Sequence, residues 1–535
     1  MTDVAPRTGK PGRVPSALPG RLSTVPLDRT RLLSVAALTE RLPPRIRTGY
    51  WTRLVPALAL LATLTHIPSF VRPVWSPDEG YLATQARMLA DGGVLYDTVV
   101  DRKPPLLPWL YEACFAVFGS LSLWPLRVLA IGAHLVTALL MVSIARGRWG
   151  GRAGAAAGAL YLLVSIGLSP SDTQAATFEV FMLPSMVAAF WYAERRRGLA
   201  AGVATAVCAL TKQTGGAVLL PVLWILFQDA RRRGLSVPAA LGRVLFGFAL
   251  PIALVAAMLT KPKGFLFWVV TGSGDYASLD GDLLLMIGRA LGNAAILGAA
   301  AFGLALPLLR RRRARRRAAA AGVEFPERRA ASQGSTADLW IWLVSAVIAV
   351  CTGFHFFGHY YLQLIPPLIL LGVGAVATSA LSWRPVLVYS VAASTVFWCL
   401  ALAWPGHRLD RSAKVATAVA EQTTPKDTML VWGMHPEMYW LADRRPATRY
   451  LTAGFLTNYS GGKGDQKIGE KYSVQDAWKT FDQELSHHLP EIVVDDSAKS
   501  PYSPLRFPRI ERLLDTHYQM VGLTGDTVIY RLVRR

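Results

Sequence analysis

Long apolar runs separated by clusters of basic residues dominate this sequence of 535 residues. From Trp51 onward, runs of roughly 18 to 27 mostly apolar residues recur, each long enough to cross a hydrocarbon core of about 30 Å. Hydrophobic residues make up 52% of the chain and charged residues only 17%. This is too little charge to cover the surface of a soluble protein of this length. The sequence therefore predicts a polytopic α-helical membrane protein.

The distribution of positive charge argues against nucleic acid as a partner. A net charge of +22 would suggest nucleic acid in a soluble protein, but here the arginines form short clusters between apolar runs. Such clusters are typical of cytoplasmic loops and also meet anionic membrane lipids. No aromatic and basic platform accompanies them. The clusters are Arg195–Arg197, Arg231–Arg233, Arg310–Arg313 and Arg315–Arg317.

These clusters predict how the chain is threaded through the cell membrane. Residues 1–50 are rich in Pro, Arg and Ser and read as a disordered basic cytoplasmic tail. Residues 51–404 are expected to cross the membrane about eleven times, with 72–123 as a long first external loop. From residue 405 to 535 the long apolar runs stop, and short apolar strands such as Thr428–Trp432 and Thr527–Leu532 alternate with helix-like stretches. This part reads as an extracytoplasmic α/β domain.

A short stretch between two basic clusters predicts a charged cavity at membrane depth. Only about thirty mostly apolar residues, or two helices of about 22 Å each, lie between Arg195–Arg197 and Arg231–Arg233. The turn between these helices would fall at Thr211–Gly216 and contains Lys212. Irregular backbone and an ammonium group cannot face lipid, so Lys212 is expected to line a protein cavity or a wet cleft.

The first external loop holds most of the unusual polar residues in the first half of the chain. Asp78 and Glu79 follow the first apolar run closely, Tyr81 comes next, and the loop ends with Asp101-Arg102-Lys103-Pro104-Pro105-Leu106. Pro77-Asp78-Glu79 is also a fair helix start, so one interpretation is that Asp78 merely caps that helix. The other is that these carboxylates belong to a reaction site.

The loop resembles one superfamily in particular. An Asp-Glu pair after the first span, Tyr81, and Lys103-Pro104-Pro105-Leu106 at the loop's end are similar to the GT-C group of polyprenyl-phosphate-sugar glycosyltransferases. The closest pattern is the branch of lipid A aminoarabinose transferases and protein O-mannosyltransferases. Leu210–Gln213, His359-Tyr360-Tyr361 and Trp432-Gly433 agree more loosely.

The resemblance implies a GT-C-like catalytic domain over residues 51–404 and a hexosyl- or pentosyltransferase activity at the outer membrane face. The donor would be a sugar on polyprenyl phosphate, and the acceptor hydroxyl would belong to a cell-envelope glycan, glycolipid or protein. The transfer would proceed with inversion. Asp78 matches the family's first-loop carboxylate and is the candidate base, and Glu79 would tune or orient it.

The remaining candidate residues are cations for the donor phosphate and polar groups for the sugars. Lys103 matches the motif lysine, and Arg102, Lys212 and His359 are further candidates for the phosphate. Tyr81, Asp101, Asp172 and Glu179 are candidates for contact with the acceptor or donor sugar. Glu179 lies among apolar neighbours and needs a partner, so a buried pair with an arginine is the alternative.

No metal ligand is assigned, although a divalent metal ion is left open as a cofactor. His355 and His359 are spaced i, i+4 and could form half of a metal site, but no further pattern completes it. Some relatives have a glutamate before the motif lysine, where this chain has Arg102. This departure argues against a metal and adds a cation for the phosphate.

Two other functions and one further hypothesis stay open at this point. The chain could transport or flip lipid-linked sugars, or bind them without catalysis for a partner enzyme. Neither alternative needs a base beside phosphate-binding cations.

In the C-terminal domain, Trp432, His435 and Tyr439 are candidates for stacking on sugar rings, and the alternative is that they belong to its core.

Overall fold

The structure is a computed structural model that describes residues 49–272, 281–321, 336–379, 381–461 and 467–533. The predicted tail, residues 1–50, lies outside the described residues except for residues 49 and 50. Residues 54–535 form one compact unit, and the fold below is the fold of that unit.

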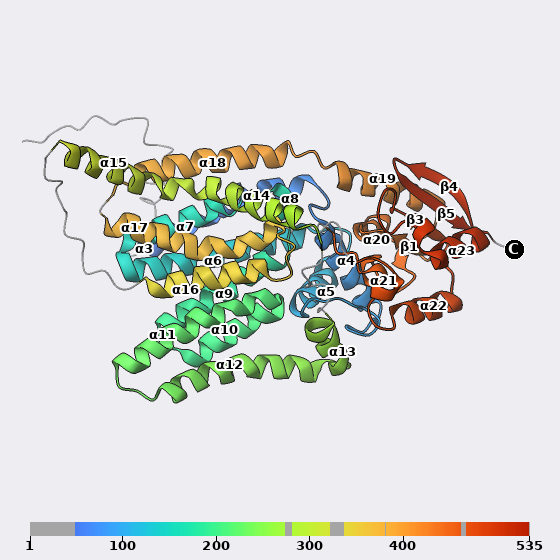
Figure 1. Cartoon of the computed structure of the whole chain (residues 1–535), viewed down its shortest axis with the longest axis horizontal. Coiled ribbons are helices and arrows are strands. Elements are labelled where there is room, and N and C mark those ends of the chain that lie inside the picture. The colour runs from blue at the N-terminus through green and yellow to red at the C-terminus, as the bar shows by residue number, and fades with distance from the viewer. Residues whose placement is uncertain (1–48, 273–280, 322–335, 380, 462–466, 534–535) are drawn as a thin grey trace, which may run out of the picture. The chain divides into compact units, whose positions relative to one another are not determined.

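Helices rich in alanine, leucine and valine run alongside one another between residues 50 and 402 (Figure 1). They are α3 (Tyr50–His66), η2 (Ile67–Val71), α6 (Trp124–Trp149), α7 (Gly151–Val164), α8 (Pro170–Thr173), α9 (Phe178–Glu194), α10 (Gly198–Thr211), η3 (Gln213–Val218), α11 (Leu219–Arg232), α12 (Val237–Met258), α13 (Pro262–Leu266), η4 (Phe267–Thr271), α14 (Leu283–Ala301), η5 (Phe302–Leu304), α15 (Leu306–Ala320), α16 (Ala337–Cys351), η6 (Gly358–Leu364), α17 (Ile365–Thr378) and α18 (Arg384–Leu402).

Several of these helices have the length and composition of membrane spans. In the described part of the chain, six helical segments are long and apolar enough to cross a membrane, and shorter apolar helices accompany them. The structure thus agrees with a helical, multi-pass membrane protein. The count of about eleven crossings also includes the shorter helices and stays a prediction.

The short helix pair expected around Lys212 is present. Helices α10 and α11 have 14 residues each, and the 3-10 turn η3 separates them. Lys212 ends α10 in an extended conformation, and its side chain is only 4% exposed. The break places an ammonium group inside the protein, as the sequence predicts.

The first loop is more ordered than the sequence indicated. It contains two helices, α4 (Pro77–Ala90) and α5 (Leu106–Phe118), although only the first was expected. Leu82, Ala83 and Ala86 of α4 are fully buried. Helix α4 is therefore an interior helix and not an amphipathic surface helix, because other elements cover most of its sides.

Residues 407–532 contain the sheet of the described chain. Its five strands have the order β2-β1-β3-β5-β4. Strand β1 pairs in parallel with β2 and β3, whereas β5 is antiparallel to β3 and β4. The elements are α19 (His407–Gln422), β1 (Thr428–Trp432), α20 (Glu437–Ala442), β2 (Arg445–Pro446), α21 (Gly454–Thr457), η7 (Glu470–Tyr472), α22 (Ala477–His487), β3 (Ile492–Asp495), η8 (Pro504–Arg506), α23 (Pro508–His517), β4 (Tyr518–Thr524) and β5 (Thr527–Leu532).

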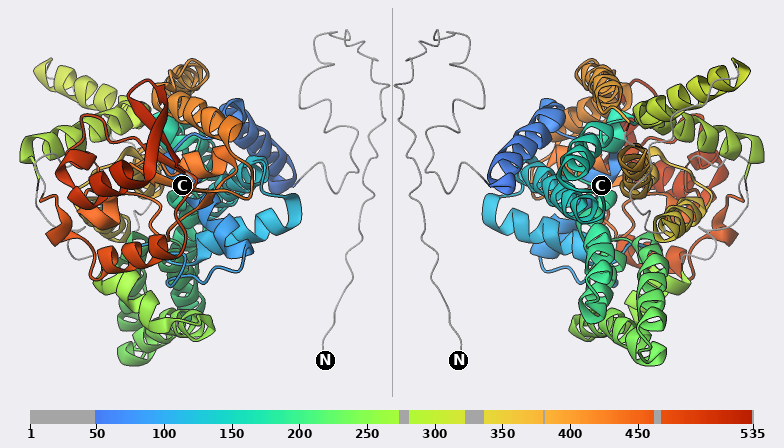
Figure 2. Two further views of the ribbon diagram at one scale, coloured as in Figure 1. Left: turned by 90° about the vertical axis from the view of Figure 1, so that its right-hand side faces the viewer. Right: turned by 90° about the vertical axis from the view of Figure 1, so that its left-hand side faces the viewer.

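The C-terminal residues pack against the first loop. They lie at one end of the helices in Figure 1 and therefore face the viewer in the left-hand view of Figure 2. A Cβ atom on Gly80 of α4 would lie 2.2 Å from the Cβ of Glu437 on α20, so the close approach of these helices requires glycine. Buried side chains of the loop, such as Leu95 and Val99, share an apolar cluster with Val493. The loop is thus held between the helices and the sheet, although a separate domain from residue 405 stays a prediction.

Candidate active site

A cavity of about 770 Å³ lies where the first loop, several helix ends and the C-terminal residues meet. It receives most of the polar residues singled out in the sequence. The predicted residues in its lining are Asp78, Tyr81, Asp101, Arg102, Lys103, Asp172, Lys212 and His359. Charged and amide residues in the lining that the sequence did not indicate are Arg289, Asn293, Arg408, Arg411, Asp496 and Asp526.

Asp78 is an accessible carboxylate at the start of α4. Ser76 is the N-cap residue, and its Oγ accepts a hydrogen bond from the Asp78 backbone N–H at 3.2 Å. The Asp78 side chain is 48% exposed and is not needed as the cap. Its Oδ2 lies 3.9 Å from His359 Nε2. The geometry leaves this carboxylate available to a bound molecule.

Glu79 has a different environment from its neighbour. It is fully buried and does not line the cavity. Its Oε2 accepts a hydrogen bond from the Trp75 N–H at 2.7 Å, and its Oε1 accepts one from the Ala176 N–H at 2.7 Å. Arg127, 1% exposed, lies 3.3 Å from Oε2. Glu79 thus fixes the beginning of α4, and these contacts give it a structural role beside the predicted catalytic one.

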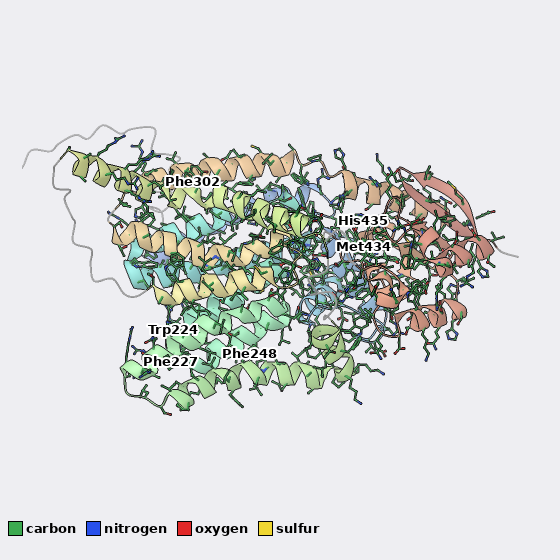
Figure 3. All side chains as sticks on the ribbon, in the orientation of Figure 1. Trp224, Phe227, Phe248, Phe302, Met434 and His435 are labelled. Carbon is green, nitrogen blue, oxygen red and sulfur yellow. The ribbon has the colours of Figure 1, made fainter. Side chains whose placement is uncertain are left out.

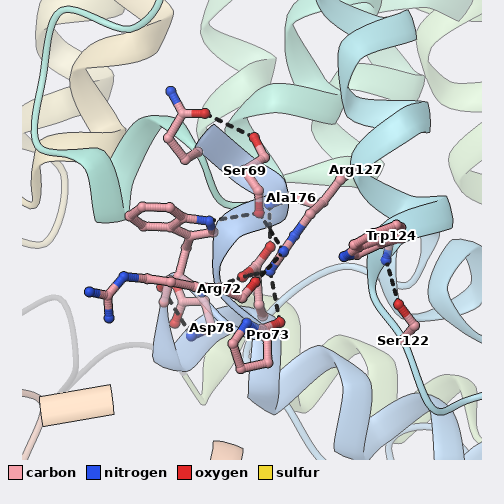
Figure 4. A network of polar contacts seen from close by, with 12 residues as sticks. Ser69, Arg72, Pro73, Asp78, Ser122, Trp124, Arg127 and Ala176 are labelled. Carbon is pink, nitrogen blue, oxygen red and sulfur yellow. Dashed lines mark hydrogen bonds and ion pairs between the residues drawn. The ribbon is translucent and has the colours of Figure 1, made fainter. Parts of the chain in front are cut away.

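Arg127 completes this buried network. Its guanidinium donates to the carbonyl oxygens of Ser69 and Arg72, each at 2.5 Å, and to that of Pro73 at 2.8 Å (Figure 4). The network joins α6 to the segment that precedes Asp78. Since carbonyl and carboxylate oxygens surround the guanidinium, the position of α4 depends on it.

Cations on one side of the cavity lie over aromatic rings that also line it. The Arg102 guanidinium is 4.9 Å from the Phe455 ring centre, and the Lys103 ammonium is 6.0 Å from that of Phe178. The Lys212 ammonium is 3.9 Å from the ring of Tyr360, and the Arg289 guanidinium is 5.2 Å from that of Phe357. Cation–π contacts hold the charges in place while leaving them able to bind an anion.

Lys212 is the buried partner of Glu179. The two side chains form an ion pair, with Lys212 4% and Glu179 1% exposed. The alternative considered for Glu179 was an arginine partner, and the structure shows a lysine instead. Glu179 itself does not line the cavity, and its Oε2 has no hydrogen-bond partner in the described part of the chain. Its predicted contact with a sugar would have to pass through Lys212.

Arg289 and Asn293 are lining residues that sequence reasoning missed. Both lie on α14, in an otherwise apolar run. A signal was present, because a lone arginine in an apolar helix is costly and usually functional. Asn293 Nδ2 donates to the Phe356 carbonyl at 2.9 Å, and Arg289 Nη1 donates to that of His355 at 3.4 Å. Both side chains therefore support the loop before His359.

The C-terminal side of the cavity contains His435, which lies beside Met434 between the helices and the sheet (Figure 3). His435 Nδ1 is 2.8 Å from Glu437 Oε1, and its Nε2 is 3.6 Å from Asp496 Oδ2. Burial alone would lower the pKa of His435, but the hydrogen bond to Glu437 and the charges of the two carboxylates raise it above the ordinary value. The wall thus favours a positive charge.

The aromatic candidates of the C-terminal part are core residues. Trp432 and Tyr439 are each 1% exposed. Trp432 Nε1 donates to the Tyr502 carbonyl at 2.9 Å, and Tyr439 Oη accepts from the Val431 N–H at 2.8 Å. The hypothesis that these rings stack on sugars is wrong for this structure, because strand β1 is covered on both faces. Only His435 of that predicted set lines the cavity.

No metal site is defined by the described residues. Among them, no group of three or more His, Cys, Asp or Glu side chains is arranged to hold a metal ion. His355 and His359 do not share a helix face, because the backbone between them is irregular, and His355 stacks on Phe357 at 5.4 Å.

Asp101 gives a prediction about pH. It is 8% exposed, and burial, partly offset by Lys103, raises the pKa of Asp101 from 3.8 to about 6. The folded state then binds more protons than the unfolded state between these values, so stability falls as pH rises through the window. Asp101→Asn removes this penalty. We expect the free energy of unfolding of the variant to exceed that of wild type at pH 7.5 by at most about 3 kcal/mol.

Thermal unfolding in detergent at several pH values measures this effect. The advantage of Asp101→Asn should shrink as pH falls from 7.5 and vanish near pH 4. A stability difference that does not change with pH would mean that the Asp101 carboxyl keeps an ordinary proton affinity in the fold.

The helices, the charged cavity and the small sheet together define a multi-pass membrane protein with a polar site at one end of its helices. A family model described as dolichyl-phosphate-mannose-protein mannosyltransferase matches residues 102–259. A search of curated protein sequences gives no match.

Solved structures of two glycosyltransferases share the fold of this chain. ArnT from Cupriavidus metallidurans bound to undecaprenyl phosphate matches with a TM-score of 0.60 and 16% identity, over 90% of this chain and 98% of that chain. ArnT from the same organism in the apo state matches with a TM-score of 0.58 and 17% identity, over 90% of this chain and 98% of that chain. An Archaeoglobus fulgidus oligosaccharyltransferase tethered with an acceptor peptide matches with a TM-score of 0.51 and 14% identity, over 91% of this chain and 74% of that chain. These are GT-C glycosyltransferases, so this chain has the GT-C fold, and the predicted resemblance is confirmed.

Proposed function

We propose that this protein is a glycosyltransferase that moves a sugar from a polyprenyl-phosphate donor to a hydroxyl of a cell-envelope acceptor. The observation that carries the proposal is the cavity, which combines the accessible carboxylate of Asp78 with the cations Arg102, Lys103, Lys212 and Arg289. Such a transfer needs a base for the acceptor and positive charge for the leaving phosphate. The undecaprenyl phosphate bound to ArnT supports a donor of this class.

The proposed reaction uses the cations and the Asp78 carboxylate that line the cavity. The donor phosphate would bind among the cations, with the polyprenyl chain between helices and the sugar C1 toward Asp78. Asp78 accepts the proton of the acceptor hydroxyl while the hydroxyl oxygen forms a bond to C1 of the sugar. The bond from C1 to the phosphate oxygen breaks on the opposite side, and polyprenyl phosphate leaves with the electron pair. A single displacement of this kind inverts the configuration at C1.

The orientation of the chain is part of the proposal. The arginine clusters would lie in the cytoplasm and the cavity at the outer face, as in the positive-inside pattern. The N-terminus would then be cytoplasmic and residues 405–535 extracytoplasmic. The acceptor would enter from the side of His435, where the C-terminal residues form the cavity wall.

Replacing Asp78 by Asn tests the proposal. The purified protein is incubated with polyprenyl-phosphate sugars and a cell-envelope fraction, and release of polyprenyl phosphate is measured. We expect wild type to consume the donor and Asp78→Asn to be slower by at least about a hundredfold, the usual range for loss of a general base. Donor binding should persist in the variant, because the cations remain.

Asp91→Asn is the matched control. Asp91 lies in the same loop, is 47% exposed in its ion pair with Arg445, and does not line the cavity. It should turn over donor like wild type. Donor that binds wild type without being consumed, even with acceptor present, would favour a transporter or a non-catalytic binder of lipid-linked sugars.

A further inference from the structure

The imidazole of His359 is fixed by a single carboxylate. Asp172 Oδ1 accepts a hydrogen bond from the His359 backbone N–H at 2.9 Å and lies 2.9 Å from His359 Nδ1. A Cβ atom on Gly358 would lie 2.2 Å from Asp172 Oδ2, so only glycine lets the carboxylate reach this position. Asp172 therefore sets both the backbone and the ring orientation of His359.

The loop that leads to His359 is held in a strained conformation. Phe354 and Phe356 have φ angles of 56° and 50°, in the left-handed region that bulky residues rarely adopt. Such a conformation is unfavourable for a bulky residue and persists only where its surroundings enforce it. The hydrogen bond from Asn293 to the Phe356 carbonyl, at 2.9 Å, is one such constraint. Strain of this kind is common where a side chain must be placed accurately.

The other edge of the imidazole faces Asp78. His359 Nε2 lies 3.9 Å from Asp78 Oδ2, and the ring stacks on Phe357 with centres 5.6 Å apart and planes 10° from parallel. A distance of 3.9 Å suits an ion pair, and catalytic contacts often shorten when substrate binds. His359 thus bridges a buried carboxylate and the accessible one.

The charged groups around the ring come from several elements. Asp172 belongs to α8, Asp78 to α4, Glu179 to α9, and Lys212 ends α10. Lys212 is already paired with Glu179. The nearest partners of the imidazole, Asp172 and Asp78, are both carboxylates, and the ring lies between them.

We propose that Asp172 and His359 form a positioning pair that orients Asp78 for its role as base. This inference rests on the proposed function. It replaces the expectation that His359 binds the donor phosphate and that Asp172 contacts a sugar. Asp172 holds the ring, the ring holds the Asp78 carboxylate, and the phosphate is left to Arg102, Lys103, Lys212 and Arg289.

The test compares turnover and donor affinity in His359→Gln, Asp172→Asn and the double variant. We expect kcat to fall by about 10- to 100-fold in each, as for a misplacement of about 1 Å, while the Kd for polyprenyl phosphate stays within about threefold of wild type. The double variant should be no slower than the worse single variant, because the residues act as a unit.

His355→Gln is the matched control for a merely structural effect. His355 is 1% exposed, stacks on the same Phe357, and does not line the cavity. It should keep the wild-type kcat and the wild-type Kd for polyprenyl phosphate even if its melting temperature falls.

Other results would overturn the proposed positioning role of Asp172 and His359. A Kd for polyprenyl phosphate raised more than tenfold in His359→Gln, with kcat unchanged, would show a phosphate ligand instead. A double variant whose loss in kcat is the product of the single losses would show that the residues act separately. Wild type that binds donor but never consumes it would overturn the proposed function and this inference together.

Discussion

Arg127→Met is expected to destabilise the protein by about 3–5 kcal/mol, because it leaves the Glu79 carboxylate buried without its cation. Both side chains are essentially inaccessible, at 1% and 0% exposed. The change also removes the hydrogen bonds to the carbonyls of Ser69, Arg72 and Pro73. Methionine keeps much of the side-chain volume, so the loss should reflect charge and hydrogen bonding more than packing. Turnover should fall as well, since Asp78 follows Glu79 at the start of the same helix.

The double variant Arg127→Met, Glu79→Leu separates the charge effect from the hydrogen bonds. Removing both partners of a buried pair leaves no uncompensated charge, so the double variant should be more stable than the sum of the single losses predicts. Thermal unfolding in detergent gives the three values. If the stability loss of the double variant equals the sum of the single losses, or if Arg127→Met melts like wild type, then water reaches Glu79 and the pair does not hold α4.

Adjacent residues show where sequence reasoning stops. Asp78 and Glu79 are both carboxylates at a helix start, and the local pattern offers no distinction between them; only the family resemblance selected Asp78 as the base. Successive residues on a helix point about 100° apart, so one faces the cavity and the other faces Arg127. The environment that separates an accessible acid from a structural one is tertiary and cannot be predicted from local pattern.

Local signals predicted the parts of the site that depend on them. Lys212 was found because charge in a short apolar stretch is costly, and strands β1 and β5 were found because short apolar runs follow the last long one. Arg289 carried the same kind of signal as Lys212 and could have been found.

On the C-terminal side of the cavity, His435 was a candidate from the sequence, whereas Asp496 was not. His435 and Asp496 reach the cavity only because α20 packs on Gly80 of α4, a contact between segments far apart in the chain. The same packing buries α4. Trp432, a candidate for stacking on sugars, instead contacts Trp478 and Phe507 and is part of the core.

Lys212 is the residue at which fold and proposed chemistry meet, and its replacement is the second large effect we expect. Lys212→Met leaves Glu179, 1% exposed and with one oxygen already lacking a partner among the described residues, without its cation. The expected loss of stability is about 3–5 kcal/mol. The same change removes a cation from the cavity lining, so donor binding should weaken too. A single variant cannot tell these two consequences apart.

Lys212→Met combined with Glu179→Leu removes the buried charge and keeps the defect in phosphate binding. We expect its melting temperature to recover most of the loss, while the Kd for polyprenyl phosphate stays about ten- to a hundredfold weaker, the contribution of a charge-assisted hydrogen bond. Saturating polyprenyl phosphate should then raise the melting temperature of wild type more than that of the double variant, because ligand stabilisation follows affinity. If the double variant binds polyprenyl phosphate as tightly as wild type, Lys212 serves only the fold, and the donor phosphate must rest on Arg102, Lys103 and Arg289.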